Sequence, residues 1–118
     1  MSQFPAINTA IPKKRYQVGD YGVTVLGEID SSDPVSYQYI MAFVPEGARQ
    51  PVLYVCSEKA LPKDRHAGSH QLRVINSAMS EVVDQGDQWR DLEAFTGQAL
   101  QLGMQMLGLN NETVATLM

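Results

Sequence analysis

YQYIMAFV, residues 37 to 44, is the stretch that decides the fold of this 118-residue chain. Aromatic and branched side chains favour β-strands, and successive side chains of a strand point to opposite faces. One face of the predicted strand carries Tyr37, Tyr39, Met41 and Phe43. The other face carries Ile40, Ala42 and Val44.

The next stretch, PVLYVCSE, predicts a second strand from Val52 to about Ser57. Its alternation sets Val52, Tyr54 and Cys56 against Leu53 and Val55. Both faces of the two strands are therefore apolar. Because one helix covers only one face of a sheet, the second face needs a cover from the N-terminal arm, a partner chain or a ligand.

Toward the N-terminus, Gly19-Asp20 is a typical two-residue hairpin turn between two β runs. The second run places Val23, Val25 and Ile29 on one face, and SSDP at residues 31 to 34 forms the next turn. Residues 1 to 13 contain two prolines and show no sustained period. We therefore expect an extended N-terminal arm at residues 1–13 and a single α+β domain at residues 14–118.

Beyond the second strand, a loop from Ala60 to Ser69 leads to QLRVIN, which alternates again. Residues 79 to 84, MSEVVD, either extend this strand or begin a helical turn, and the sequence leaves both possibilities open. The connections between the first four strands are short. An antiparallel meander of four or five strands is therefore the simplest topology.

The period of the apolar residues changes at Asp87. Residues 87 to 107, DQWRDLEAFTGQALQLGMQML, predict one long C-terminal helix packed on the sheet. Its apolar stripe comprises Leu92, Phe95, Ala99, Leu102 and Met106. Asp87 is the expected N-cap and Gly108 the expected terminator. ETVATLM, residues 112 to 118, is expected to form a short terminal helix, capped by Asn110 or Asn111.

The net charge of the chain limits the kinds of molecule that we expect it to bind. Nine Lys and Arg residues stand against 13 Asp and Glu residues, a net charge of −4. Nucleic acids and anionic membranes both require a basic surface, so we expect neither as a partner. No apolar run approaches the roughly 20 residues of a membrane-spanning helix. Cys56 is the single cysteine and the N-terminus lacks a signal-peptide pattern, so we expect a cytoplasmic protein.

KDRHAGSH, residues 63 to 70, holds both histidines of the chain. On a helix, His66 and His70 would align as metal ligands, and Asp64 would offer an oxygen. Pro62 and the Ala-Gly-Ser segment disfavour a helix, however, and the sequence supplies no further histidine or second cysteine. We therefore expect a solvent-exposed loop here and no metal site.

Cys56 would act as a nucleophile only with a lowered pKa and a base, such as His66 or His70 folding back toward it. Signatures of cysteine hydrolases are absent, so a buried structural cysteine is the favoured interpretation. The carboxylates Glu28, Asp30 and Asp33 lack the ligand spacing of a calcium loop. There is no glycine-rich phosphate loop and no G-x-S-x-G elbow. The sequence therefore predicts no cofactor and favours a non-catalytic protein over an enzyme.

The predicted helix has no charged side chain between Glu93 and Glu112. A solvated helix face normally carries charged pairs. The positions away from the apolar stripe hold Gly97, Gln98, Gln101, Met104 and Gln105. Small and flexible side chains allow another protein surface to approach closely. Chance, or cover by loops of the same chain, explains the same pattern.

Two functions follow from these patterns. The first is a non-catalytic protein-interaction module, most simply a homodimer, since two-fold dimers are the commonest homo-oligomers, with an unidentified protein partner as a variant. The second is a small-molecule-binding protein or enzyme with a pocket between sheet and helix. The residues expected to line that pocket are Tyr37, Tyr39, Tyr54 and Trp89.

Overall fold

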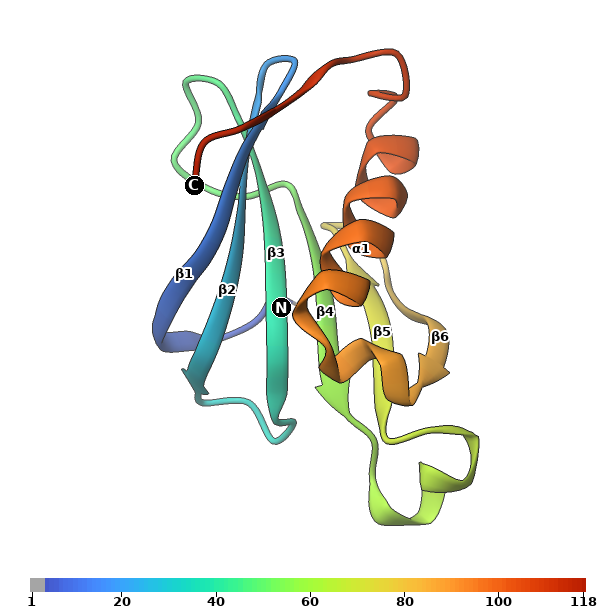
Figure 1. Cartoon of the computed structure of the whole chain (residues 1–118). Helices are drawn as coiled ribbons and strands as arrows, with labels where there is room; N and C mark the ends of the chain where they lie inside the picture. Colours follow the sequence, from blue (N-terminus) through green and yellow to red (C-terminus); the bar gives the residue numbers. More distant parts are fainter. Residues whose placement is uncertain (1–3) are drawn as a thin grey trace.

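The computed structural model describes residues 4–118 and contains one antiparallel sheet with a helix across one face (Figure 1). The strands are β1 (Ile7–Val18), β2 (Tyr21–Ser31), β3 (Tyr37–Pro45), β4 (Leu53–Lys59), β5 (His70–Ile75), β6 (Ser80–Gly86) and β7 (Val114–Thr116). The helices are the 3-10 turns η1 (Pro62–Ala67) and η2 (Asp87–Arg90) and the α-helix α1 (Leu92–Met106). In the sheet the strand order is β6-β5-β4-β3-β2-β1-β7.

The α+β architecture and the meander are confirmed, but within residues 4–118 the sheet has seven strands rather than four or five. The two-residue turn at Gly19-Asp20 is also confirmed, since β1 ends at Val18 and β2 begins at Tyr21. The stretch at residues 79 to 84, left open by the sequence, belongs to strand β6. Residues 7 to 13 are extended and paired as part of β1, so the boundary expected between residues 13 and 14 falls inside a strand.

The expected short terminal helix is wrong. Residues 114 to 116 form β7, which pairs with β1 in the register Tyr16↔Thr116 and Val18↔Val114. The segment after α1 crosses to β1 (Figure 1), where the backbone of Arg15 also exchanges hydrogen bonds with Leu117 and Met118. Threonine and valine favour strands, and the free edge of β1 offers backbone partners that a two-turn helix in water lacks.

The N-cap of α1 is Asp91 and not Asp87. The Asp91 side chain accepts a hydrogen bond from the backbone N–H of Ala94, whereas Asp87 starts the preceding turn η2. Gly108 is confirmed as the helix terminator. It has a φ of 69°, and the N–H of the next residue, Leu109, donates to the Met104 carbonyl in the last turn of α1. This is the hydrogen-bond pattern of a Schellman motif, in which glycine adopts the left-handed conformation without strain.

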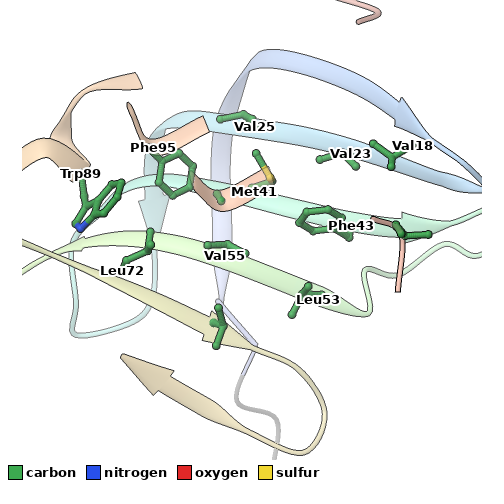
Figure 2. Packing of buried hydrophobic residues seen from close by; sticks show 13 residues of the cluster. Val18, Val23, Val25, Met41, Phe43, Leu53, Val55, Leu72, Trp89 and Phe95 are labelled. Carbon is green, nitrogen blue, oxygen red and sulfur yellow. The ribbon is translucent and has the colours of Figure 1, made fainter. Parts of the chain in front are cut away.

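The first face of the sheet, which α1 covers, holds the larger hydrophobic core (Figure 2). Its buried members are Val18, Val23, Val25, Met41, Phe43, Leu53, Val55, Leu72, Val74, Trp89, Phe95, Ala99 and Leu109. In the predicted helical stripe, Phe95 and Ala99 are buried but Met106 is 39% exposed. Gly103 is buried against the sheet instead of Met106. A Cβ at this position would lie 2.0 Å from the Phe43 ring. A residue without a side chain lets the helix rest directly on the aromatic ring.

The second face has a smaller buried cluster of Ile40, Ala42, Tyr54, Cys56 and Ile75. The N-terminal segment contributes to its cover: Phe4 packs on Tyr54, with ring centroids 5.3 Å apart, and Ile7 joins the same cluster. The sequence left three possible covers for this face: the N-terminal arm, a partner chain or a ligand. The N-terminal residues of the chain therefore provide at least part of the cover.

The expected direction of Ile29 is wrong, because β2 contains a bulge. The pairing of β1 with β2 shifts register between Thr9 and Ile11, and Glu28 adopts a φ of 47°. Positive φ is uncommon outside glycine and marks a local irregularity of the backbone. Ile29 consequently packs with the second-face cluster and not with Val23 on the first face.

A second bulge reverses Tyr37. In β3, Tyr37 lies opposite Glu58 and Tyr39 lies opposite Ser57, so two residues of β3 advance against one residue of β4. Alternation is interrupted by the extra residue, and the side chains of the two tyrosines point to opposite faces. Tyr39 packs on the first-face core and Tyr37 on the second-face cluster.

No helix among residues 4–118 is long and apolar enough to cross a membrane.

Candidate functional site

The aromatic pocket expected between sheet and helix is not formed. Tyr39 and Trp89 belong to the core under α1, whereas Tyr37 and Tyr54 belong to the cluster on the opposite face. The bulge in β3 is the main cause, since it moves Tyr37 away from Tyr39. The space under the helix is filled by the core that Figure 2 shows.

A cleft of about 210 Å³ lies instead on the second face. It is lined by Phe4, Asp33, Pro34, Val35, Tyr37, Glu58, Arg73, Ile75 and Ser80. The lining therefore combines the N-terminal segment, the loop between β2 and β3, and side chains from β3, β4, β5 and β6. Residues distant in the sequence meet here because the meander sets β3 to β6 side by side.

Asp33 fixes one wall of the cleft. Its Oδ2 accepts a hydrogen bond of 2.7 Å from the Tyr37 hydroxyl and one of 2.9 Å from the backbone N–H of Ala6. Burial, together with the hydrogen bond to Asp33, raises the pKa of Tyr37 above its usual value. The phenol therefore stays protonated near neutral pH and donates to the carboxylate, which ties the N-terminal segment to β3.

An ion pair lines the cleft. Arg73 Nε donates to Glu58 Oε1 at 3.0 Å, and Arg73 Nη1 donates to Ser80 Oγ at 3.1 Å. Glu58 is only 3% exposed, while the Arg73 side chain is 28% exposed. A buried carboxylate is costly without a charged or hydrogen-bonding partner, so Arg73 is required to keep Glu58 in this position.

Three polar atoms at the cleft have no hydrogen-bond partner among residues 4–118: Glu58 Oε2, Asp33 Oδ1 and Arg73 Nη2. In the same part of the chain, Thr96 Oγ1 is the one fully enclosed side-chain N or O atom that lacks a partner. The three cleft atoms are therefore not sealed off from the outside. They place two anionic groups and one cationic group around a partly apolar hollow.

The sequence did not single out Glu58, Arg73 or Ser80. Their signal is present in retrospect: Arg73 interrupts the apolar run between Leu72 and Val74, and Glu58 continues the alternation of β4 toward the second face. Charged residues at inward positions of adjacent strands indicate a buried pair. Only the register of β4 with β5 shows that the two side chains meet.

The two histidines lie in different environments. His66 is exposed in η1, as expected for a loop. His70 is buried at the start of β5, so the expectation of a solvent-exposed loop is wrong for this residue. Its Nδ1 lies 2.8 Å from Ser69 Oγ and its Nε2 lies 3.3 Å from Gln38 Oε1. Burial and the nearby charge of Lys59 lower the pKa of His70.

The other sequence candidates are also placed. No group of three or more His, Cys, Asp or Glu side chains arranged to hold a metal ion occurs in the described part of the chain, so His66, His70 and Asp64 do not form one. Cys56 is fully buried, and burial raises the pKa of its thiol well above the usual value. A raised pKa suppresses the thiolate, which is the reactive form of cysteine.

The outer surface of α1 matches the sequence expectation in part. Gly97, Gln101 and Gln105 are exposed, and a Cβ on Gly97 would meet no atom of residues 4–118 within 4 Å. Gln98 is half-buried, and Met104 packs against the first-face core. The uncharged outer face is therefore narrower than expected from the sequence.

The two edges of the sheet differ in how well they are protected against pairing with a strand of another chain. β7 covers residues 16 to 18 of β1, and the remaining edge of β1 carries Pro12, Lys13 and Lys14. Proline and lysine on an edge discourage pairing with another chain. The other edge is β6, which pairs with β5 on one side and with no other strand of residues 4–118. Its seven residues, SEVVDQG, include no proline or lysine, but they include Glu81 and Asp84 and a bulge at Val83 opposite β5; Val82 and Val83 are 42% and 45% exposed.

Comparisons of the chain with family models, with curated proteins and with solved structures find no match.

Proposed function

We propose that this chain is a non-catalytic protein-interaction module that forms a homodimer in the cytoplasm. The open edge of β6 is the observation that carries the proposal. A strand edge presents a row of unpaired backbone N–H and C=O groups, and pairing them with a second strand is a common mode of protein association. Exposed Val82 and Val83 add apolar surface beside those groups.

A second copy of β6 is the occupant that fits this edge. In an antiparallel pair with the two-fold axis at Val82, Ser80 lies opposite Asp84 of the partner subunit, and Glu81 lies opposite Val83 of the partner subunit. This register keeps the acidic side chains from facing each other, and like charges directly opposite destabilise a strand pair. The two-fold axis closes the assembly after two copies, which avoids an open-ended filament.

Association is tested by light scattering on the wild-type protein at several hundred micromolar, with Val82→Glu and Gln101→Glu as matched variants. Each substitution adds one negative charge at an exposed position, one on the β6 edge and the other on the outer face of α1. We expect a wild-type dimer that Val82→Glu weakens at least tenfold and Gln101→Glu leaves unchanged. Thermal unfolding of both variants controls for loss of the fold.

Two results would contradict the proposal in different ways. A wild-type monomer throughout the concentration range excludes the homodimer. A dimer that Gln101→Glu weakens and Val82→Glu does not would move the interface to Gly97, Gln101 and Gln105 on α1, the face indicated by the sequence.

A further inference from the structure

We propose that the cleft on the second face binds a small α-amino acid with an apolar side chain, in its zwitterionic form. The inference rests on the unpaired polar atoms of Asp33, Glu58 and Arg73 and does not depend on the dimer. The cleft lies on the sheet face opposite α1 and is built from side chains of several elements.

The ammonium group has two acceptors available. Glu58 Oε2 and Asp33 Oδ1 each lack a partner within residues 4–118, while the other oxygen of each carboxylate is already bonded, to Arg73 Nε and to the Tyr37 hydroxyl respectively. Both carboxylates are therefore held in place before a ligand arrives. A fixed acceptor loses little conformational entropy on binding a charged donor.

The carboxylate of the ligand has a donor in Arg73 Nη2. The Nε and Nη1 atoms are occupied by Glu58 and Ser80, which fixes the plane of the guanidinium and leaves the N–H groups of Nη2 available. A bare amine would offer no acceptor to Arg73 Nη2, and a bare carboxylate would face Asp33 and Glu58. A zwitterion satisfies both signs of charge, and its two charged groups lie close together, as Glu58 and Arg73 do.

The apolar walls of the cleft select the side chain of the ligand. Phe4, Val35 and Ile75 line the cleft with apolar surface, and Phe4 also packs on Tyr54. A cleft volume of about 210 Å³ leaves room for roughly seven to ten non-hydrogen groups at about 20–30 Å³ each. A branched aliphatic amino acid of leucine size has nine non-hydrogen atoms and fits this space.

The bulges at Glu28 in β2 and before Tyr39 in β3 support a binding role for this face. They redirect Tyr37, which lines the cleft, and Ile29, which does not, away from the alternation of their strands; β2 ends and β3 begins at the loop that carries Asp33. Bulges are frequent next to functional sites, where they re-aim side chains. Without the bulge in β3, the Tyr37 hydroxyl would not reach Asp33, and this wall of the cleft would not form.

The experiment is an NMR titration of the ¹⁵N-labelled full chain with L-leucine near neutral pH. 3-Methylbutylamine and 4-methylpentanoate, which carry the same branched carbon chain with only one of the two charged groups, are titrated in parallel. We expect leucine to bind with a Kd of about 1 mM, ordinary for so small a ligand. The affected amides should belong to Asp33, residues 35 to 37, Arg73 and Ser80, and each single-charge ligand should bind at least about tenfold more weakly.

Two variants complete the test. Arg73→Gln should abolish the response to leucine, whereas Arg49→Gln, the same change on an exposed loop, should leave it intact. If Arg73→Gln does not fold, Val35→Trp fills the cleft from the loop side and should block binding in the same way. The proposal is overturned if leucine shifts no cleft amide at tens of millimolar, or if the amine binds as tightly as leucine. A leucine response that persists in Val35→Trp also overturns it.

Discussion

The two faces of the sheet are buried in different ways. On the first face, α1 seals a core of 13 buried apolar residues, and the helix approaches so closely that Gly103 rests on Phe43. On the second face, five apolar residues are buried, and their cover includes the short N-terminal segment beside an ion pair and an open cleft. The long amphipathic helix α1 covers the first-face core completely. The short N-terminal segment covers only part of the second face and leaves polar atoms of the cleft accessible. The first face therefore accounts for stability and the second face for the candidate ligand site.

Truncating an aromatic side chain on each face measures this difference most directly. Phe95→Ala removes a fully buried ring from the first-face core and should cost about 3–5 kcal/mol of unfolding free energy. Phe4→Ala removes a half-buried ring from the second face and should cost about 1–2 kcal/mol, because less surface returns to water. Urea denaturation of both variants gives the two values. Equal losses would show that the N-terminal segment contributes as much stability as the helix.

Adding a methyl group to each side of α1 sharpens the comparison. Gly103→Ala forces a Cβ to within 2.0 Å of the Phe43 ring, so we expect a loss of about 1–3 kcal/mol. In the described part of the chain the new methyl group of Gly97→Ala meets no atom within 4 Å on the outer side, so this change should stabilise the helix by about 0.5–1 kcal/mol. Thermal or urea unfolding of the pair measures both effects. A neutral Gly103→Ala would mean that the helix can move away from the sheet at little cost.

The smallest expected effect is a dependence of stability on pH that comes from His70. Burial lowers its pKa in the folded chain below the usual 6.5, so the unfolded chain takes up this proton first. The contribution of His70 to the unfolding free energy therefore falls as the pH drops below about 6.5, until the folded chain is protonated as well. Urea denaturation across this range should show the decrease in the wild type and a smaller one in His70→Gln.

Exposed His66 provides the control for that measurement. His66→Ala should change the unfolding free energy by no more than about 0.5 kcal/mol. If the wild type and His70→Gln depend on pH in the same way, the buried imidazole is not the group responsible.

The sequence predicted secondary structure best where apolar and polar side chains alternate clearly or where a glycine marks a turn. The alternation of residues 37 to 44 and the Gly19-Asp20 turn identified strands and a hairpin, and Gly108 marked the helix end. The site was not predictable in the same way. Glu58 and Arg73 are ordinary charged residues in the sequence, and they become a site only because β4 and β5 pair with Cys56 opposite Arg73.

The sequence by itself determined an α+β chain with an antiparallel meander and a helix terminated by Gly108, because side-chain periodicity and turn chemistry act over a few neighbouring residues. Tertiary structure decided the rest. Bulges in β2 and β3 moved Ile29 and Tyr37 to the second face, and the free edge of β1 drew residues 114 to 116 into a strand. These outcomes depend on which backbone groups meet across the sheet, and contacts between distant segments override the local preferences that a sequence pattern records.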